Sequence, residues 1–214
     1  VDIMFSSFDE DAGRDERPFD CTDQPAPRAW PDPERLEQVL ALVKAAERPV
    51  IISGHGIWWS GGEAALGTAG TKLRMPIFNV PYHTKMLDED CDAYIGLADF
   101  HQFHPSKPAI HEADLVLMVG SRLDNQMNFG NPPFIQPETK LVCVNGSHEE
   151  LDYNIGADLQ LLSDPGAFLT ALAQVDKTFD GWLELQRTRR ADWVSEWSAH
   201  IAAQTAQDEA EGRK

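Results

Sequence analysis

Short apolar stretches alternate with amphipathic ones along most of the chain. The apolar stretches are PVIISG (49–54), PIFNV (76–80), LVLMVG (115–120), LVCVNG (141–146) and ADLQLLS (157–163). Nearly continuous apolar runs of this length are typical of parallel strands that are buried on both faces. Between them, apolar residues recur at helical spacing, so the pattern predicts strands that alternate with helices.

Such alternation predicts an α/β fold with a doubly wound, mainly parallel, Rossmann-like sheet of five or six strands. We expect residues 33–176 to form this domain, with the first helix beginning at Pro33. Residues 1–32 are acidic and rich in proline, and we interpret them as the end of a preceding domain and a linker. Residues 177–214 predict an amphipathic connector helix, and residues 81–102 a long irregular stretch.

The composition of the chain excludes some classes of binding partner. The formal net charge is −17, which disfavours nucleic acid and anionic membrane surfaces. No apolar run is long enough to span a bilayer. Cys21, Cys91 and Cys143 are widely spaced, so we expect a reduced, cytoplasmic protein without a disulfide framework. The chain begins with Val1 and we interpret it as a piece of a longer protein.

The first candidate site is the turn after the first predicted strand. Gly54 and Gly56 allow either a tight turn or the close approach of backbone to a pyrophosphate. The third glycine of the G-x-G-x-x-G motif is replaced by Trp59, and Asn79 stands where an acid would hold a nicotinamide ribose. The sequence therefore disfavours a nicotinamide-dependent dehydrogenase.

Other polar residues follow later strands, at the edge where doubly wound sheets bind ligands. Arg122 and Asp124 indicate either an ion pair that fixes a loop or an arginine that binds a phosphate. Asn145 suits a turn or a ribose contact, and Asp164 suits the N-cap of a helix.

The sequence offers no catalytic signature. It contains no Walker loop, G-x-S-x-G elbow or H-E-x-x-H pair. His101, His104 and His111 lie close together, but their spacing around Pro105 does not place them on one helix face. We therefore predict neither a metal site nor a catalytic residue in this chain.

The ordered series of motifs resembles the central domain of thiamine-diphosphate-dependent enzymes of the acetolactate synthase type, over about residues 34–175. The series is RPVIISGHGIWWSGGEAAL, MPIFNV, EADLVLMVGSRLDNQMNFGNPP, LVCVNGSHEEL and LLSD. Within that family, GSRLDNQMNFGNPP is most similar to 2-hydroxyacyl-CoA lyases and oxalyl-CoA decarboxylases. The opening VDIMF resembles the last strand of the pyrimidine-binding domain, and residues 177–214 resemble the connector to the pyrophosphate-binding domain.

The resemblance implies a division of labour in a longer parent enzyme, a cytoplasmic homodimer or homotetramer. Thiamine diphosphate and magnesium would be held by the pyrimidine-binding and pyrophosphate-binding domains, which are the implied partners of this chain. The fragment alone would then be inactive. The central domain binds FAD in acetolactate synthases, and ADP or the nucleotide end of CoA in the CoA-ester enzymes.

The resemblance also implies seven cofactor-binding residues: Gly54, His55 and Gly56 at a phosphate-facing turn, Arg122 and Asn145 at the nucleotide, and Ser163 and Asp164 near the adenine. Asn145 and Ser163 replace the family's aspartate and glycine. The preferred parent is a lyase that cleaves 2-hydroxyacyl-CoA to an aldehyde or ketone and formyl-CoA. The alternatives are an acetolactate synthase with FAD in this domain and a stand-alone, non-catalytic nucleotide-binding module.

Overall fold

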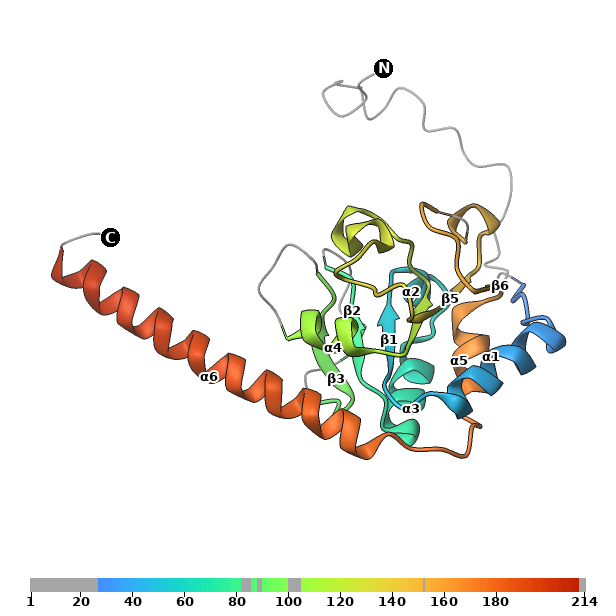
Figure 1. The fold of residues 1–214 in the computed structure, drawn as a ribbon, viewed down its shortest axis with the longest axis horizontal. Helices are drawn as coiled ribbons and strands as arrows, with labels where there is room; N and C mark the ends of the chain where they lie inside the picture. The colour runs from blue at the N-terminus through green and yellow to red at the C-terminus, as the bar shows by residue number, and fades with distance from the viewer. Residues whose placement is uncertain (1–26, 82–85, 88–89, 100–104, 152, 212–214) are drawn as a thin grey trace, which may run out of the picture.

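The computed structural model describes residues 27–81, 86–87, 90–99, 105–151 and 153–211. Within those residues, six strands form one sheet (Figure 1). The strands are β1 (Pro49–Ser53), β2 (Ile77–Asn79), β3 (Tyr94–Leu97), β4 (Leu115–Val119), β5 (Lys140–Asn145) and β6 (Leu159–Leu162). The helices are α1 (Pro33–Ala45), α2 (Gly56–Trp59), α3 (Glu63–Leu73), α4 (Ser106–Glu112), α5 (Pro165–Leu172) and α6 (Asp180–Ala210), with 3₁₀ segments η2 (Asn125–Gly130) and η3 (His148–Glu150).

All strand pairs in the sheet are parallel, in the order β3-β2-β1-β4-β5-β6. This confirms the predicted α/β, doubly wound fold. Every residue of β1 and β4 is buried, because helices cover both faces of these central strands. Chain order reverses between β1 and β4, and the crevice outside such a reversal is where doubly wound sheets bind ligands.

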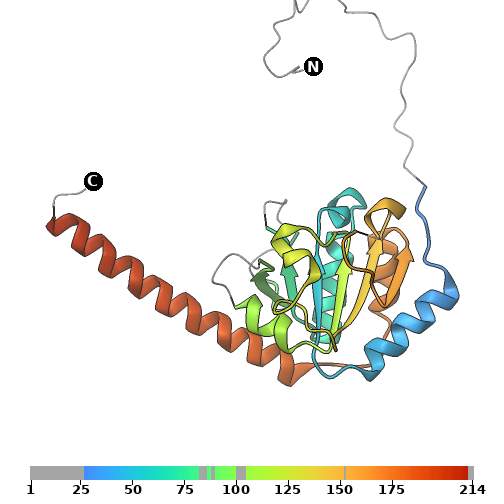
Figure 2. The ribbon, with the colours of Figure 1, turned by 45° about the horizontal axis from the view of Figure 1, so that its top comes forward.

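Two layers of helices cover the sheet. In Figure 2, α1 and α4 lie on the side of the sheet nearer the viewer, and α3 and α5 lie behind it. The α3 and α5 helices contact each other, and α1 contacts β6. This arrangement follows from the right-handedness of crossover connections between parallel strands. A connection that leads toward the β3 edge lies on one face of the sheet, and a connection that leads toward the β6 edge lies on the other face.

Local sequence sets the starts of two helices. Asp32 caps α1 by accepting a hydrogen bond from the Arg35 N–H at 2.9 Å, directly before Pro33. Asp164 caps α5 by accepting from the Ala167 N–H at 2.8 Å, directly before Pro165. In both cases a carboxylate satisfies a free amide and proline supplies a helical φ.

Two local expectations were wrong. Residues 81–102 were expected to be irregular, but they contain β3, a four-residue edge strand that pairs with β2 through an irregular register. The helix expected after β5 is only the 3₁₀ turn η3. The connector helix predicted within residues 177–214 is α6, which ends at Ala210. The strand expected at VDIMF lies outside the described residues.

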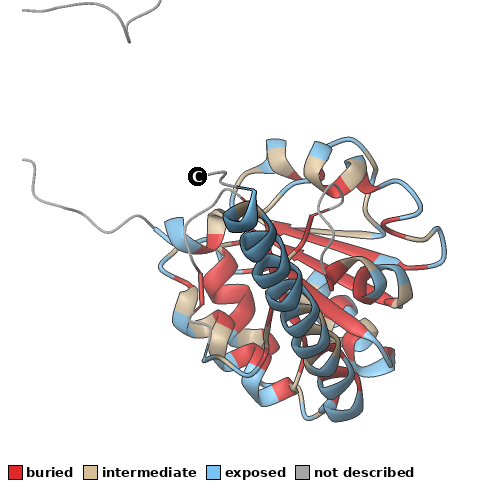
Figure 3. Ribbon diagram, turned by 90° about the vertical axis from the view of Figure 1, so that its left-hand side faces the viewer, coloured by how far each residue is buried: buried red, intermediate tan, exposed pale blue. Residues whose placement is uncertain are grey.

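The α6 helix is anchored at one end only. Trp182 and Leu183 are buried, and the Trp182 indole N–H donates to the Pro49 carbonyl at 3.0 Å. Beyond Arg190 the helix leaves the domain and is almost entirely exposed (Figures 1 and 3). In the part of the chain described here, no helix combines the length and apolar character needed to cross a bilayer.

Candidate functional site: a pocket where the strand order reverses

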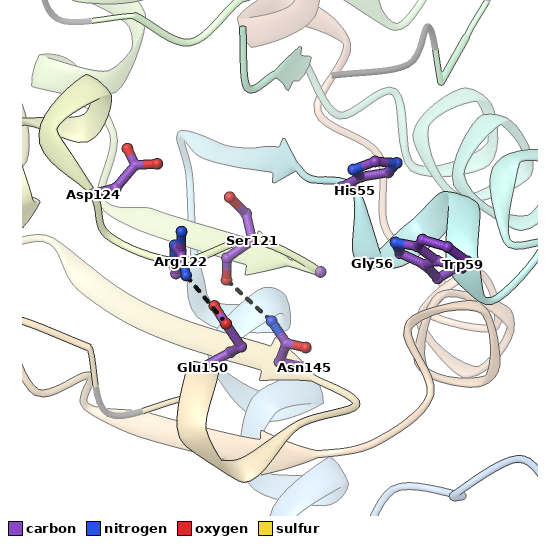
Figure 4. Close-up of a pocket in the computed structure, with 9 residues that line it drawn as sticks. His55, Gly56, Trp59, Ser121, Arg122, Asp124, Asn145 and Glu150 are labelled. Carbon is purple, nitrogen blue, oxygen red and sulfur yellow. Dashed lines mark hydrogen bonds and ion pairs between the residues drawn. The ribbon is translucent and has the colours of Figure 1, made fainter. Parts of the chain in front are cut away.

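A pocket of about 260 Å³ lies at the carboxyl ends of β1, β4 and β5. Its position is the one predicted from the topology, because β1 and β4 separate there toward connections on opposite faces. Figure 4 shows side chains from three loops that point into this space. The lining residues are His55, Gly56, Trp59, Gly120, Ser121, Arg122, Asp124, Asn145 and Glu150.

The floor of the pocket is formed by backbone that only glycine permits. A Cβ on Gly56 would lie 2.8 Å from the Gly120 Cα, and one on Gly54 would lie 2.7 Å from the Ser121 Cα. Gly120 itself has a φ of +65°, which favours glycine. These glycines therefore allow the β1–α2 turn and the β4 exit to pack against each other.

The amides of this turn already have acceptors within the protein. Gly54 N–H donates to the Val119 carbonyl at 2.9 Å, and Gly56 N–H donates to the Gly120 carbonyl at 2.8 Å. These two glycine amides are therefore not available to bind a phosphate. The phosphate-facing role that the resemblance implies for Gly54 and Gly56 stays a prediction.

Arg122 is the cation of the pocket, and it has two neighbours. Its Nη1 lies 3.3 Å from Oε1 of Glu150, and its guanidinium lies 5.1 Å from the centre of the Tyr153 ring. The arginine side chain is 48% exposed, so solvent and ligands can reach it. The pair fixes the direction of the guanidinium, and the Glu150 carboxylate competes with any anion that would bind there.

Asp124 and Asn145 organise the rim. Asp124 caps η2 by accepting from the Gln126 N–H at 3.0 Å. The Asn145 side chain donates to the Ser121 carbonyl at 3.4 Å and accepts from the Ser147 N–H at 3.3 Å. Asn145 therefore connects the β4 and β5 loops, and its long, weak bond to Ser121 is one that a ribose hydroxyl could replace.

An exposed aromatic group stands at one side of the pocket. Trp59 is 75% exposed, and the His55 ring lies 5.8 Å from it and 5.3 Å from Trp58. An indole face held open to solvent can stack on a base, whereas a core tryptophan cannot. The sequence alone does not separate packing from stacking on a ligand, and the exposure of Trp59 is what distinguishes the two roles.

Ser163 and Asp164 lie outside the pocket. The Ser163 hydroxyl and the Asp164 N–H both donate to the Ala29 carbonyl, at 3.3 and 2.7 Å, and the Asp164 carboxylate caps α5. Of the seven predicted residues, His55, Gly56, Arg122 and Asn145 line the pocket, and Gly54 lies directly beside it. Sequence reasoning missed Glu150, which it placed in an ordinary helix and whose only signal was its place after β5.

The described residues offer little else for catalysis. No group of three or more His, Cys, Asp or Glu among them is arranged to hold a metal ion, and His101 and His104 lie outside those residues. Burial raises the pKa of the Cys143 thiol on β5 to about 12, so it stays protonated and unreactive at neutral pH.

Comparison with known proteins identifies the fold's family. Residues 36–172 match the family described as the central domain of thiamine pyrophosphate enzymes, and this range is more than half of the chain. The chain belongs to this family. The resemblance inferred from the motifs is thereby confirmed.

Relatives of this central domain include both enzyme types expected from the sequence. It is 27% identical over 154 residues to the acetolactate synthase large subunit of Lactococcus lactis, covering 71% of this chain and 27% of that protein. It is 25% identical over 139 residues to human 2-hydroxyacyl-CoA lyase 1, covering 64% and 23%. The chain therefore spans about a quarter of the length of these relatives.

The fold of the central domain is shared with solved structures. An X-ray structure from Mycobacterium smegmatis, assigned to thiamin diphosphate-dependent enzymes, superposes with a TM-score of 0.62 at 22% identity, over 72% of this chain and 30% of that one. Benzoylformate decarboxylase from Polynucleobacter necessarius gives a TM-score of 0.60 at 20% identity, over 73% and 29%. At this identity the likeness concerns the fold.

Proposed function

We propose that this central domain binds ADP or the nucleotide end of CoA within a thiamine-diphosphate-dependent carbon–carbon lyase. The parent cleaves a 2-hydroxyacyl-CoA to an aldehyde or ketone and formyl-CoA. The observation that carries the proposal is the pocket where the strand order reverses, which brings Arg122, Asn145 and Trp59 together. A cation, a hydrogen-bonding amide and an exposed indole suit the phosphate, ribose and base of a nucleotide.

The volume of the pocket indicates that it encloses only part of a nucleotide. About 260 Å³ is below the roughly 300–1,000 Å³ typical of pockets that bury drug-sized ligands. It suits the phosphate and ribose of a nucleotide whose base stacks on Trp59 at the mouth. The larger FAD would need additional surface.

We assign thiamine diphosphate, with its Mg²⁺ and its carbanion chemistry, to the neighbouring domains of the parent, as the family resemblance implies. Binding and spacing are the part that we assign to this domain.

Acetolactate synthase is the second candidate. Three of the relatives are named as acetolactate synthase large subunits, two of them as probable ones, at 20–27% identity. In that case the central domain would hold FAD. A third possibility, a stand-alone module, predicts that the natural protein has the mass of one domain, whereas the enzyme predicts a chain of roughly 550–600 residues in three domains.

A titration of the chain with ADP, CoA and FAD, followed by tryptophan fluorescence and calorimetry, separates these functions. We expect ADP and CoA to bind saturably and to change the emission of Trp59, while FAD does not bind. Binding of FAD alone would favour acetolactate synthase. If none of the three binds, the nucleotide-binding role of this domain is refuted.

A further inference from the structure

One residue of the pocket, Glu150, presents a carboxylate to the space where the proposed nucleotide would bind. Glu150 ends η3, on the connection between β5 and β6, and its side chain is 34% exposed. Its Oε1 accepts a hydrogen bond from Nη1 of Arg122 at 3.3 Å. Its second oxygen, Oε2, has no hydrogen-bond partner among the described residues. The carboxylate therefore keeps one oxygen open to a ligand.

The charges that line the pocket oppose a ligand with many phosphates. Among the described lining residues, Arg122 is accompanied by two carboxylates, Glu150 and Asp124. Asp124 accepts a hydrogen bond from the Gln126 N–H at 3.0 Å, but this contact leaves its negative charge in place. One guanidinium beside two carboxylates suits a ligand whose phosphates lie at one end, because a phosphate elsewhere in the pocket would meet negative charge.

Arg122 can bind a phosphate without releasing Glu150. A guanidinium has five N–H donors in a planar fork. Among the described residues, only Nη1 of Arg122 makes a hydrogen bond. The other donors can bind the 5′-phosphates of a nucleotide while Glu150 keeps its place in the pocket wall. The carboxylate is then part of the occupied site as well as of the empty one.

Asn145 brings the ribose to the part of the pocket that Glu150 borders. Asn145 ends β5, Glu150 lies in the turn that follows this strand, and both line the pocket (Figure 4). The weak bond from Asn145 to the Ser121 carbonyl is the one that a ribose hydroxyl could replace. A ribose held there has its hydroxyl groups within the same loop cluster as the open oxygen of Glu150.

A carboxylate distinguishes a free ribose from a phosphorylated one. It only accepts hydrogen bonds, and the ribose hydroxyls can donate them. A phosphate on the 3′ oxygen removes that donor and brings negative charge against the carboxylate. Dinucleotide-binding sites use the same contrast, because an acid binds the ribose 2′-hydroxyl of NAD whereas an arginine accommodates the 2′-phosphate of NADP. The Asn145 amide both donates and accepts, so it does not make this distinction.

We propose that Glu150 is the specificity-determining residue of this pocket and selects nucleotides whose ribose hydroxyls are free. The inference rests on the proposed nucleotide-binding function and narrows its ligand. ADP meets the requirement, whereas the nucleotide end of CoA carries a 3′-phosphate that would face Glu150. The pocket therefore binds ADP in preference to CoA.

Two isomeric ligands test the selection on the 214-residue chain. ADP and adenosine 3′,5′-bisphosphate contain the same atoms, and they differ in whether the second phosphate extends the 5′ end or sits on the ribose. In calorimetric titrations we expect ADP to bind about tenfold more tightly, because the 3′-phosphate lies against a carboxylate. Equal affinities, or tighter binding of the bisphosphate, would overturn the selection while leaving the nucleotide site intact. If neither ligand binds, the proposed function fails and the inference fails with it.

Removing the charge of Glu150 tests the residue itself. Glu150→Gln keeps an acceptor oxygen, and we expect it to raise the affinity for the bisphosphate about tenfold and the affinity for ADP by less. Glu149→Gln is the matched control, because Glu149 is an exposed residue of the same turn and does not line the pocket. The control should keep the ligand preference of the unchanged chain, and thermal unfolding checks that both variants fold. An unchanged preference in Glu150→Gln, or the same change in both variants, would contradict the role of Glu150.

Discussion

Arg122 is held in the pocket by a carboxylate rather than left open for an anion. Its ion pair with Glu150 is half-exposed, so the pair itself contributes at most about 1 kcal/mol to folding. In the proposed function its larger effect is on binding, because a phosphate would have to displace Glu150 or share the guanidinium with it. At this scale the pair sets the direction of the arginine.

Changing the two members of the pair should move nucleotide affinity in opposite directions. Arg122→Ala should weaken ADP binding by about 1.5–3 kcal/mol, the range for a charge-assisted hydrogen bond. Glu150→Gln should strengthen it, because a competing negative charge is removed. Calorimetry measures both, with the exposed Arg28→Ala as a matched control. Unchanged affinity in Arg122→Ala would leave the arginine a purely structural role.

Two backbone segments approach each other closely at the floor of the pocket, and this contact predicts that a larger residue there lowers the stability of the fold. Gly54→Ala should lower the free energy of unfolding by about 1–3 kcal/mol, because the new Cβ meets Gly120 and Ser121 and backbone must shift. Gly67→Ala on α3 is the control, since its Cβ has only the Leu87 side chain within reach, at 3.4 Å. That variant should be stabilised by roughly 0.5–1 kcal/mol. Urea unfolding of both variants checks this contrast.

At the scale of elements, capping carboxylates and side-chain bridges fix where helices and strands begin. Judged from the sequence alone, Asp164 suits two roles, the N-cap of a helix and a contact to a nucleotide. Its carboxylate caps α5, its N–H donates to the Ala29 carbonyl, and it is not among the residues that line the pocket. The described contacts account for Asp164 without a ligand.

Asp164→Ala should therefore change stability and leave binding unchanged. Loss of an N-cap costs about 0.5–2 kcal/mol, whereas Asp164→Asn keeps the capping oxygen and should cost much less. Thermal unfolding and an ADP titration of the two variants give both quantities. A clear loss of ADP affinity in Asp164→Ala would restore the adenine-binding role that the family resemblance implies.

Asp158 links the starts of β5 and β6 and should make stability depend on pH. Desolvation raises the pKa of its carboxyl, but hydrogen bonds from the Leu141 N–H and from Lys140 outweigh it, so the folded-state pKa is lowered. Its stabilisation is therefore complete above the unfolded pKa of about 3.9 and is lost as pH falls through the lower folded pKa. Urea unfolding between pH 6 and pH 3 should show the difference between wild type and Asp158→Asn shrinking toward low pH; a constant difference would be inconsistent with this role.

At the scale of the whole molecule, the order of the strands in the sheet determines where the pocket lies. The reversal between β1 and β4 is the only one in the described sheet. The chain spans about a quarter of the relatives it matches. In the proposed function, this domain contributes ligand binding and spacing, and the thiamine chemistry belongs to the neighbouring domains of the parent.

We expect the chain alone to turn over neither a 2-hydroxyacyl-CoA nor pyruvate when thiamine diphosphate and Mg²⁺ are supplied. The reason is that, in the proposed function, the groups that hold and activate the cofactor belong to the neighbouring domains of the parent. A coupled assay for formyl-CoA and an assay for acetolactate measure this directly. Turnover that scales with the concentration of purified chain would show that the domain carries its own catalytic groups.

The sequence by itself determined the class of fold and the edge of the sheet at which the candidate pocket lies. Continuous apolar runs such as 115–120 can be buried only as central parallel strands, and parallel strands bring the loops after them to one edge. Arg122 and Asn145 could therefore be placed together before any coordinates. The caps at Asp32 and Asp164 were equally local, because a cap and the amide it accepts from are three residues apart.

Only the tertiary structure decided what depends on contacts between distant segments. β3 is too short and too partly buried to leave a periodic signal, and it is a strand because β2 offers it hydrogen-bonding partners. The residues around Gly54 in the sequence do not indicate that it must lack a Cβ so that its backbone can contact the segment after β4. The pairing of Arg122 with Glu150, the exposure of Trp59 and the separation of Ser163 from the pocket likewise depend on how loops far apart in the sequence meet, and local patterns do not encode those distances.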